Sequence, residues 1–470
     1  MISTDLALSE KNIELQKDKV FGEHPEVVLV APCKFGEGII KVDQTNQLGY
    51  IHKFDVTKMS TCFFVPASGS GSRMFQFLYD FLEQPSEDNR SNVERFLNNI
   101  TDFAFFQQIP LEIRKKIEAF ELDLDEVVSY LLKSHGMGYG DLPKGLIPFH
   151  KLDPFILTPF QEQVLQGVRV KNENVSFHFT IQSVFEDIIK NGINQAQSLT
   201  GQNYNVSFSV QDKGTNAIAF NSEKKTFIKD DGSILDRPAG HGALLENLNK
   251  IESDFIFIKN IDNIQPFVKS DKAITTWKLL GGLLLSFKEE AKKVYDNPSI
   301  ETFKSLNDKY QIVSSSEINE NLTTDKIQSI LNRPARVCGM VRNEGQPGGG
   351  PFWVKDENGI SKQIVEKAQI TMKGEQYRLM VQSTHFNPVM IVASTKDFNG
   401  DKFDLIKYRD DSKYFIVKKK FKGQDIQFME LPGLWNGSMA YWNSLFVEVP
   451  SSTFTPVKTV LDLLDRAHSV

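Results

Sequence analysis

A loop of small residues follows a short apolar run early in the chain and could bind phosphate. Cys62–Pro66 predicts a buried strand that leads directly into Ala67–Met74, which reads Ala-Ser-Gly-Ser-Gly-Ser-Arg-Met. Glycine and serine let backbone N–H groups approach an anion, and Arg73 adds positive charge at the end of the loop. The segment is neither a Walker A loop nor a GxGxxG fingerprint, and a flexible surface turn is the alternative.

Two lysines further along the chain could neutralise phosphate as point charges. Lys144 stands in Pro143–Pro148, which reads Pro-Lys-Gly-Leu-Ile-Pro, and Lys458 stands in Val449–Thr459 before a predicted terminal helix. Taken singly, each lysine is more typical of an ordinary loop or of the exposed surface of a helix.

Gly240, His241 and Gly242 precede a predicted helix that starts close to them. Glycines at a helix start allow close backbone approach to a ligand, and the positive end of the helix dipole favours an anion there. A tight turn between a strand and a helix is the alternative interpretation.

Asp262 follows a strand predicted for residues 254–261. Open α/β sheets bind their ligands at the carboxyl ends of strands, and Mg²⁺ sites commonly combine one or two carboxylates with substrate phosphates. Asp262 is therefore a candidate Mg²⁺ ligand, and a solvated Asp-Asn turn is the alternative.

Taken together and in this order, the segments resemble the motifs of the sugar-1-phosphate nucleotidylyltransferases, most closely the UDP-sugar pyrophosphorylase branch. That family carries an AGGxGTRL-like loop, a PKxLIP-like motif, a PxGHGxxxxxL helix start, an NxDN metal strand and an FxPVKTxxDLL motif. The matching stretches are Ala67–Met74, Pro143–Pro148, Pro238–Leu248, Asn260–Asn263 and Phe454–Leu464. The resemblance extends over about residues 62–464 and suggests a bacterial side branch.

The resemblance implies a GT-A-like nucleotide-diphospho-sugar transferase fold and transfer of a nucleotide to a sugar-1-phosphate with release of pyrophosphate. By this comparison, Arg73 and the backbone of the loop hold the β- and γ-phosphates, Mg²⁺ on Asp262 is the cofactor, and Lys144 and Lys458 neutralise the sugar phosphate and the transition state. Arg73, Lys144 and Lys458 are thus the predicted catalytic residues. The partners are small molecules.

Position in the family also assigns the remaining contacts. The predicted nucleotide-binding residues are Ala67, Ser68, Gly69, Ser70, Gly71, Ser72, Gln211, Gly240, His241 and Gly242. Gln211 and Gly240 are expected against the base, which favours uracil and hence UTP. The predicted sugar-binding residues are Asn260, Glu366 and Asn387, although Glu366 and Asn387 are as typical of a surface glutamate and a turn asparagine.

The chain departs from the family pattern in two ways. Ser68 and Ser72 replace a glycine and a threonine, but both residues are small and keep the backbone accessible. A helical insertion at about residues 75–140 separates Arg73 from Pro143, and a lid, an oligomer contact and a regulatory element all remain open for it. We expect a protein without the insertion to keep a foldable phosphate loop and to change in activity. The sequence identifies no second metal carboxylate.

Two other functions compete with this interpretation. A glycosyltransferase of the same fold class would require a DxD-type metal motif, which Ile261-Asp262-Asn263 fits poorly, and it would not need three phosphate-binding cations. A non-catalytic nucleotide-sugar-binding regulator would not need transition-state charges, and the large insertion is the feature that favours it.

The elements that must position these residues alternate between strand and helix. This alternation predicts a wound mixed, largely parallel central sheet in an α/β fold. We expect an N-terminal extension at 1–60, a nucleotide-binding core at 61–330 that carries the insertion, and a β-rich part at 331–470.

Composition limits the possible partners. The 470 residues include 60 acidic and 54 basic side chains, which give a net charge of −6 and exclude nucleic-acid binding by bulk positive charge. Three scattered cysteines suggest reduced thiols, and the charged N-terminal residues are unlike a secretory signal. No apolar run approaches the ~20 residues that span a bilayer. We therefore expect a cytoplasmic enzyme without nucleic-acid or membrane partners; its sugar and oligomeric state stay open.

Overall fold

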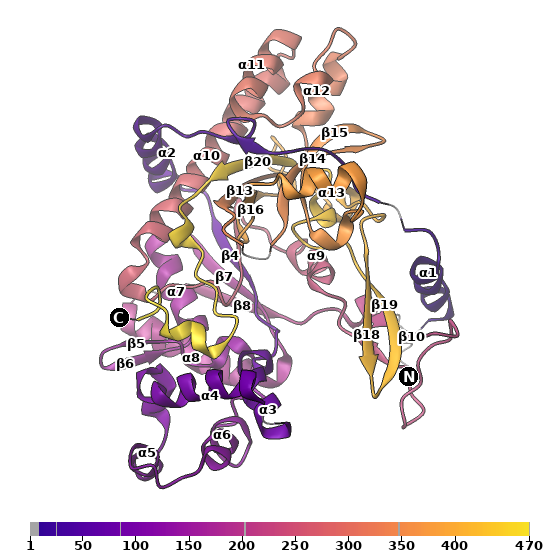
Figure 1. Ribbon diagram of the computed structural model, residues 1–470. Coiled ribbons are helices and arrows are strands. Elements are labelled where there is room, and N and C mark those ends of the chain that lie inside the picture. The colour runs from indigo at the N-terminus through magenta and orange to yellow at the C-terminus, as the bar shows by residue number, and fades with distance from the viewer. Residues whose placement is uncertain (1–8, 25, 85, 202–203, 346–347, 470) are drawn as a thin grey trace, which may run out of the picture. The chain divides into compact units, whose positions relative to one another are not determined.

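The computed structural model describes residues 9–24, 26–84, 86–201, 204–345 and 348–469, and Figure 1 traces the chain. The chain divides into two compact units, each assembled from three stretches. Unit 1 comprises Met1–Cys62, Gln211–Ile258 and Lys278–Val449, and unit 2 comprises Phe63–Val210, Lys259–Trp277 and Pro450–Val470. The domain ranges expected from the sequence stay predictions beside this division.

Unit 1 contains neighbouring strands of a mixed sheet in the order β2-β3-β20-β13-β17-β12. Their bounds are Lys34–Phe35, Gly38–Ile40, Asn443–Glu448, Ala335–Arg342, Met390–Ser394 and Phe255–Lys259. β3 is parallel to β2 and β20, β20 is parallel to β13, and β17 is antiparallel to β13. The predicted α/β class with a largely parallel central sheet is confirmed, whereas the GT-A-like identity of the fold stays a prediction.

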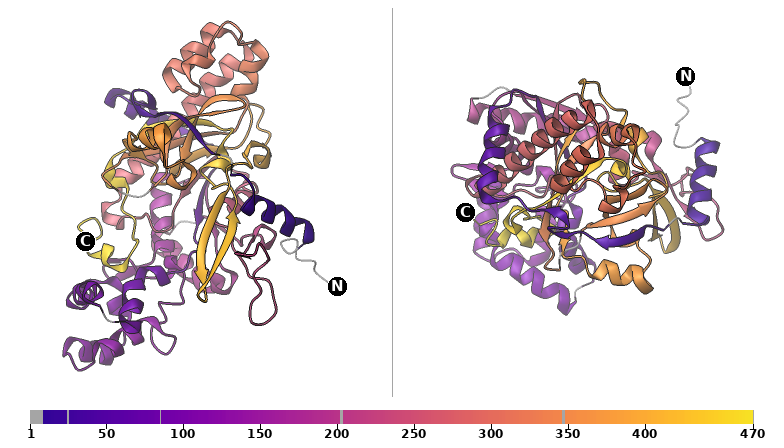
Figure 2. Two further views of the ribbon diagram at one scale, coloured as in Figure 1. Left: turned by 45° about the vertical axis from the view of Figure 1, so that its right-hand side comes forward. Right: turned by 90° about the horizontal axis from the view of Figure 1, so that it is seen from above.

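Smaller sheets and several helices complete unit 1. One sheet joins β1 (Val28–Pro32), β14 (Gly350–Asp356) and β15 (Gly359–Val365); another joins β10 (Phe220–Asn221), β19 (Gln424–Glu430) and β18 (Phe415–Phe421). β9 (Ala217–Ile218) pairs with β11 (Asp236–Arg237), and β16 (His385–Phe386) pairs with β13. The helices are α1 (Glu10–Phe21), α2 (Gln44–Val56), α9 (Leu245–Leu248), α11 (Ile300–Tyr310), α12 (Thr324–Leu331) and α13 (Gly374–Val381). Figures 1 and 2 show α1 beside the β18–β19 ribbon, and Val20 of α1 packs near Phe220.

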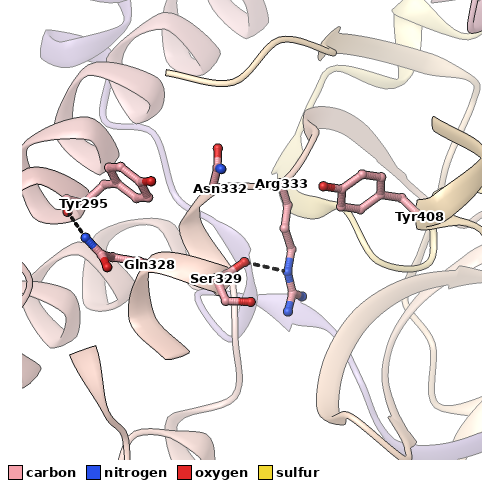
Figure 3. Close-up of a pocket in the computed structure, with 6 residues that line it drawn as sticks. All are labelled: Tyr295, Gln328, Ser329, Asn332, Arg333 and Tyr408. Carbon is pink, nitrogen blue, oxygen red and sulfur yellow. Dashed lines mark hydrogen bonds between the residues drawn. The ribbon is translucent and has the colours of Figure 1, made fainter. Parts of the chain in front are cut away.

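A polar pocket opens in unit 1 near the end of α10 (Asp271–Asp296), the longest helix. Gln328 of α12 donates its amide Nε2 to the carbonyl of Tyr295 at 2.9 Å and so ties the two helices together. These helix ends and the short 3-10 helix η12 (Leu405–Tyr408) border a pocket of about 330 Å³ (Figure 3).

Unit 2 contains the strands β4 (Thr61–Pro66), β7 (Val175–Thr180) and β8 (Asn205–Ser209) in that order, with β7 and β8 parallel. α7 (Pro159–Val170) and α8 (Glu186–Thr200) pack against each other. The hydroxyl of Thr158 caps the start of α7 through the N–H of Gln161, and Pro159 suits the first turn because it has no N–H to satisfy. A short hairpin joins β5 (His150–Leu152) and β6 (Phe155–Leu157).

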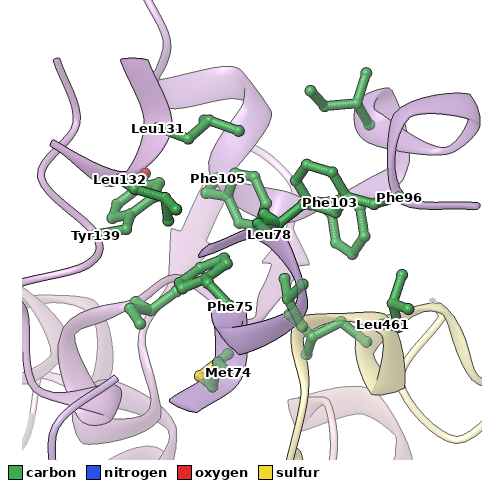
Figure 4. Close-up of a cluster of buried hydrophobic side chains, with 14 of the residues drawn as sticks. Met74, Phe75, Leu78, Phe96, Phe103, Phe105, Leu131, Leu132, Tyr139 and Leu461 are labelled. Atoms are coloured by element: carbon green, nitrogen blue, oxygen red, sulfur yellow. The ribbon is translucent and has the colours of Figure 1, made fainter. Parts of the chain in front are cut away.

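The stretch predicted as a helical insertion, at about residues 75–140, contains helices in the structure and belongs to unit 2. Its helices are α3 (Gln76–Glu83), α4 (Glu87–Asn98), α5 (Leu111–Glu118) and α6 (Leu124–Leu132). Asp123 and Glu126 form a reciprocal capping box at the start of α6. Aromatic rings fill the centre: the centroids of Phe103 and Phe105 lie 5.0 Å apart, and Phe105 meets Tyr139 at 5.4 Å (Figure 4).

The buried core of the insertion includes residues that flank the predicted phosphate-binding groups. Met74 and Phe75 follow Arg73, Ile147 follows Lys144, and Val457 precedes Lys458, and all four belong to this core. Removing the insertion would therefore expose the apolar residues that hold these motifs. The structure gives a physical reason against our expectation that a protein lacking the insertion keeps a foldable phosphate loop.

One local prediction differs from the structure: the predicted terminal helix is a 3-10 helix at Val460–Leu464. α8 continues through Gly192 to Thr200, and Gly201, which follows it, has a φ of +64°. Within the described ranges, every helix is too short or too polar to cross a membrane.

We expect Phe105→Ala to lower the free energy of unfolding by about 3–5 kcal/mol, because it leaves a cavity in the ring cluster. The matched control is Phe120→Ala in the same insertion; Phe120 is 91% exposed, so the change should stay within about 0.5 kcal/mol. Urea unfolding measures both. If both variants lowered the free energy of unfolding equally, the insertion would not have the packed core described here.

Candidate functional site

The small-residue loop is hydrogen-bonded to the first lysine motif. The N–H of Gly71 donates to the carbonyl of Leu142 at 2.9 Å, and the N–H of Lys144 donates to the carbonyl of Gly69 at 3.1 Å. Ser70 also forms a backbone bridge with Pro143. Two segments separated by the whole insertion are therefore held side by side in unit 2, as the family resemblance implies.

Lys144, Asp262 and Lys458 form one cluster in unit 2. The ammonium Nζ of Lys144 lies 3.0 Å from Oδ2 of Asp262, and Nζ of Lys458 lies 3.3 Å from the same oxygen. Lys144 also donates to the carbonyl of Val457. The side chains of Lys144 and Asp262 are nearly buried, whereas that of Lys458 is 57% exposed. Three residues predicted from separate motifs are thus brought together.

The backbone around Asp262 fixes the cluster. The N–H of Val457 donates to the carbonyl of Asp262 at 3.1 Å, and the N–H of Thr455 donates to Oδ1 of Asn263 at 2.9 Å. Gly145 lies against α7, where an added Cβ would stand 2.5 Å from Cε2 of Phe160. A glycine is therefore required next to Lys144 if the motif is to sit this close to the helix.

The cluster carries more positive than negative charge. Burial lowers the pKa of Lys144, and the nearby positive charges of Lys458 and Arg73 lower it further. The carboxylate of Asp262 raises it, but the net pKa of Lys144 remains below its usual value. Burial raises the pKa of Asp262, but the ammonium groups of Lys144 and Lys458 outweigh it, so the net pKa lies below its usual value. Asp262 is therefore ionised at neutral pH, and two cations compete for it.

Arg73 lies at the exposed end of the loop, in the 3-10 helix η2 (Ser72–Phe75). Among the described residues it makes no ion pair, so its guanidinium is available to a ligand. The carbonyl of Ser68 accepts a hydrogen bond from Nε2 of Gln182 at 2.7 Å, which fixes the start of the loop.

The turn Gly240–Gly242 lies in unit 1, and its histidine stacks on an aromatic ring. Gly240 has a φ of +35°, and an added Cβ would lie 2.6 Å from Oε2 of Glu430, so this position requires glycine. The ring of His241 stacks on Trp435 at 4.0 Å, and its Nδ1 accepts the N–H of Leu434 at 2.8 Å. The neutral ring therefore carries its proton on Nε2.

Glu366 is the predicted sugar-binding residue that lies near this turn. Its Oε1 lies 3.7 Å from Nε2 of His241, and both side chains are about one-third exposed. The structure thus places Glu366 and His241 together, although the sequence analysis assigned them to different parts of the substrate.

Other predicted residues have protein partners already. Asn387 is buried; its Nδ2 donates to the carbonyl of Gly339 at 2.9 Å and its Oδ1 accepts the N–H of Val389 at 3.1 Å. Nε2 of Gln211 donates to Oγ1 of Thr215 at 3.2 Å. The backbone carbonyl of Asn260 accepts a bond from Gln163 at 3.1 Å. The assignments of these residues to base and sugar stay predictions.

Trp435 and Glu430, which shape the His241 turn, were not among the residues predicted from the sequence. Both lie in or beside a stretch that reads Leu-Pro-Gly-Leu-Trp-Asn-Gly from residue 431. Two glycines, a proline and a tryptophan in seven residues are the signal that could have indicated a built turn.

A bound metal ion would have only one carboxylate of the cluster as a protein ligand. Within the part of the chain that the structure describes, no three His, Cys, Asp or Glu side chains gather as a metal site. Asp262 alone, with the remaining ligands from substrate and water, matches the usual Mg²⁺ arrangement and differs from a closed structural metal site.

The sequence matches one family model over residues 3–469, described as a domain of unknown function (DUF4301). No curated protein matches the chain. The solved structures that resemble it include a UDP-glucose phosphorylase from Trypanosoma brucei (13% identity, TM-score 0.45, 93% of this chain and 69% of the other). Others are a UDP-N-acetylglucosamine pyrophosphorylase, so named putatively, from Entamoeba histolytica (11%, 0.44, 89% and 82%) and a mutant UDP-glucose pyrophosphorylase from Leishmania major (12%, 0.42, 93% and 70%).

We expect Asp262→Asn to destabilise the protein by about 3 kcal/mol near neutral pH, because it leaves two adjacent ammonium groups without their anion. The native pKa of Asp262 is depressed, so its stabilisation is complete above the unfolded pKa of about 3.9 and is lost as the pH falls through the native value. Urea unfolding between pH 3 and 7 should show the difference from the unsubstituted protein shrinking at the acidic end.

The control for this experiment is Asp102→Asn, an exposed carboxylate in the same unit. It should leave stability nearly unchanged at every pH. A difference for Asp262→Asn that does not change with pH would contradict the stabilisation of the ionised carboxylate by the two lysines.

Proposed function

The chain belongs to the family of the domain of unknown function DUF4301, and we propose that this member is a nucleotidyltransferase that joins a sugar-1-phosphate to a nucleoside triphosphate and releases pyrophosphate. UTP is the favoured nucleotide. The observation that carries the proposal is the cluster of Lys144, Asp262 and Lys458 in the same unit as the loop Ala67–Ser72, which is bonded to the Lys144 motif.

In this reaction the protein itself forms no covalent bond to the substrates. An oxygen of the sugar phosphate attacks the α-phosphorus in line, and pyrophosphate leaves from the opposite side. The protein must align two polyanions and absorb the charge that develops. Lys144, nearly buried and desolvated, would act most strongly at the reacting phosphate, since electrostatic interactions gain strength away from water. Lys458, more exposed, would guide the incoming sugar phosphate.

The loop supplies the rest of the phosphate contacts. Backbone N–H groups of Ser68–Ser70 and the guanidinium of Arg73 suit the β- and γ-phosphates, because arginine forms paired hydrogen bonds with phosphate oxygens. The N–H groups of Gly71 and Ser72 already donate to the carbonyl of Leu142 and to Oγ of Ser70. Asp262 is the residue that would hold Mg²⁺, which supplies positive charge to phosphate oxygens when bound. Both lysines donate to Oδ2 of Asp262. If Asp262 held Mg²⁺, the two lysines would donate to the phosphates instead.

The contacts to the base and the sugar are proposed from the family resemblance and from the exposure of the side chains. We assign the base to Gln211 and the Gly240–Gly242 turn by position in the resembling family. Glu366 is the favoured sugar-binding residue, because its carboxylate is partly exposed and lies 3.7 Å from Nε2 of His241 in the predicted nucleotide-binding turn. Asn260 and Asn387 follow, and Asn387 would have to break two bonds to reach a ligand.

The direct test is pyrophosphate release by the purified full-length protein with Mg²⁺, each of the four nucleoside triphosphates and a panel of sugar-1-phosphates. Release with one pair would support the proposal and name the substrates. If no combination releases pyrophosphate but the protein binds UTP or a UDP-sugar, the result would favour a non-catalytic binder or a glycosyltransferase. If the protein neither releases pyrophosphate nor binds UTP or a UDP-sugar, the proposed phosphate-binding site would be wrong.

We expect Lys144→Ala and Asp262→Ala each to lower turnover by at least about 100-fold, the scale of losing one charge contact in the transition state. The matched control is Lys133→Ala, an exposed lysine at the end of α6 in the same unit, which should leave turnover unchanged. Steady-state rates at saturating substrate measure the effect, and unfolding midpoints confirm that the variants are folded. A normal rate in either variant would remove that residue from the mechanism.

A further inference from the structure

We infer that the polar pocket of unit 1, bordered by α10, α12 and η12, is a second ligand site that takes a hydroxyl-rich phosphomonoester such as a sugar phosphate. The inference does not rest on the proposed function, since it uses none of the residues of the lysine cluster. Its lining residues are Tyr295, Gln328, Ser329, Asn332, Arg333 and Tyr408.

Arg333 is the charged group of the pocket. Its Nε donates to the carbonyl of Ser329 at 3.1 Å, which holds the side chain against α12. Within the described ranges, the guanidinium lies in no ion pair, and its two terminal nitrogens make no hydrogen bond. Asp356 acts on it only through space, without forming a bridge. A cation that is partly withdrawn from water and lacks a carboxylate partner is suited to bind an anion.

The neutral lining groups complement hydroxyls. Figure 3 shows Tyr295 and Tyr408 on opposite sides of the pocket, with their hydroxyls turned toward the region of Asn332 and Arg333. Phenol, amide and serine hydroxyl groups both donate and accept hydrogen bonds, as sugar hydroxyls require. All six lining side chains carry a polar group and none is aliphatic, which disfavours a lipid or a purely apolar ligand.

The size of the pocket agrees with this ligand class. Its volume of about 330 Å³ lies at the small end of the range for ligand sites, roughly 300–1,000 Å³, and so suits a monosaccharide phosphate better than a dinucleotide.

The pocket walls are also bonded to the segment that carries Trp435. The N–H of Tyr441 donates to the carbonyl of Tyr408 at 3.2 Å, and Nδ2 of Asn443 donates to the carbonyl of Ile330, in α12, at 2.9 Å. These two bonds hold the pocket walls to residues that follow the Trp435 turn in the chain.

Calorimetric titration of the full-length chain with glucose 6-phosphate tests the inference. We expect saturable binding that Arg333→Gln weakens at least about 10-fold, because a hydrogen-bonded charge contact is lost. Tyr408→Phe, which removes one hydroxyl and keeps the ring, should weaken binding several-fold and serves if Arg333→Gln fails to fold. The control is Arg378→Gln in α13, an exposed arginine paired with Glu375, which should bind normally.

Two further arms distinguish binding in this pocket from binding at the lysine cluster and from recognition of phosphate alone. Lys458→Ala removes a proposed sugar-phosphate contact at the lysine cluster, so any binding there should weaken, whereas the binding that depends on Arg333 should remain. Binding that is lost in Lys458→Ala but kept in Arg333→Gln would place the anion at the lysine cluster and overturn the inference. Inorganic phosphate should bind more weakly than glucose 6-phosphate, and glucose should bind weakest. Equal binding of phosphate and glucose 6-phosphate would overturn recognition of the sugar, and no binding at millimolar concentration would overturn the site.

Discussion

Asp262 shares one carboxylate oxygen between the ammonium groups of Lys144 and Lys458, at 3.0 and 3.3 Å. Desolvation lowers the pKa of Lys144 and raises that of Asp262, and the attraction between the two groups opposes both effects, so that the net pKa of Asp262 lies below its usual value. Removing any one of the three changes the charge that the other two face. The loop Ala67–Ser72, the turn at Asp262 and the segment around Lys458 are therefore constrained together, although they lie far apart in sequence.

The helical insertion belongs to that constraint. Its aromatic core incorporates Phe75, Ile147 and Val457, each within three residues of a predicted phosphate-binding side chain. Packing in protein interiors is dense, so displacement of this core would move the motif backbones with it. The core of the insertion is thus packed together with the residues beside the lysine cluster.

The sequence was most informative where chemistry restricts residue type. Glycines, the paired lysine motifs and Asp262 could be predicted because few other residues perform their roles, and the cluster of Lys144, Asp262 and Lys458 is present. Boundaries were less predictable: α8 runs through Gly192 because Ile189 and Ile193 on either side are buried, and this packing outweighs the low helix propensity of glycine. Trp435 was missed because its role depends on stacking with a residue almost two hundred positions away, which no local pattern encodes.

The excess charge of the cluster bears on what the protein binds. Two ammonium groups against one carboxylate leave one positive charge in excess, and the exposed Arg73 adds to the same field, as its effect on Lys144 shows. A structural ion pair would gain stability by matching its charges, whereas here each cation weakens the hold of the other on Asp262. An anion bound beside the cluster would neutralise this excess charge. The chain as a whole is acidic, with a net charge of −6, so the local excess of positive charge at this cluster is not a consequence of composition.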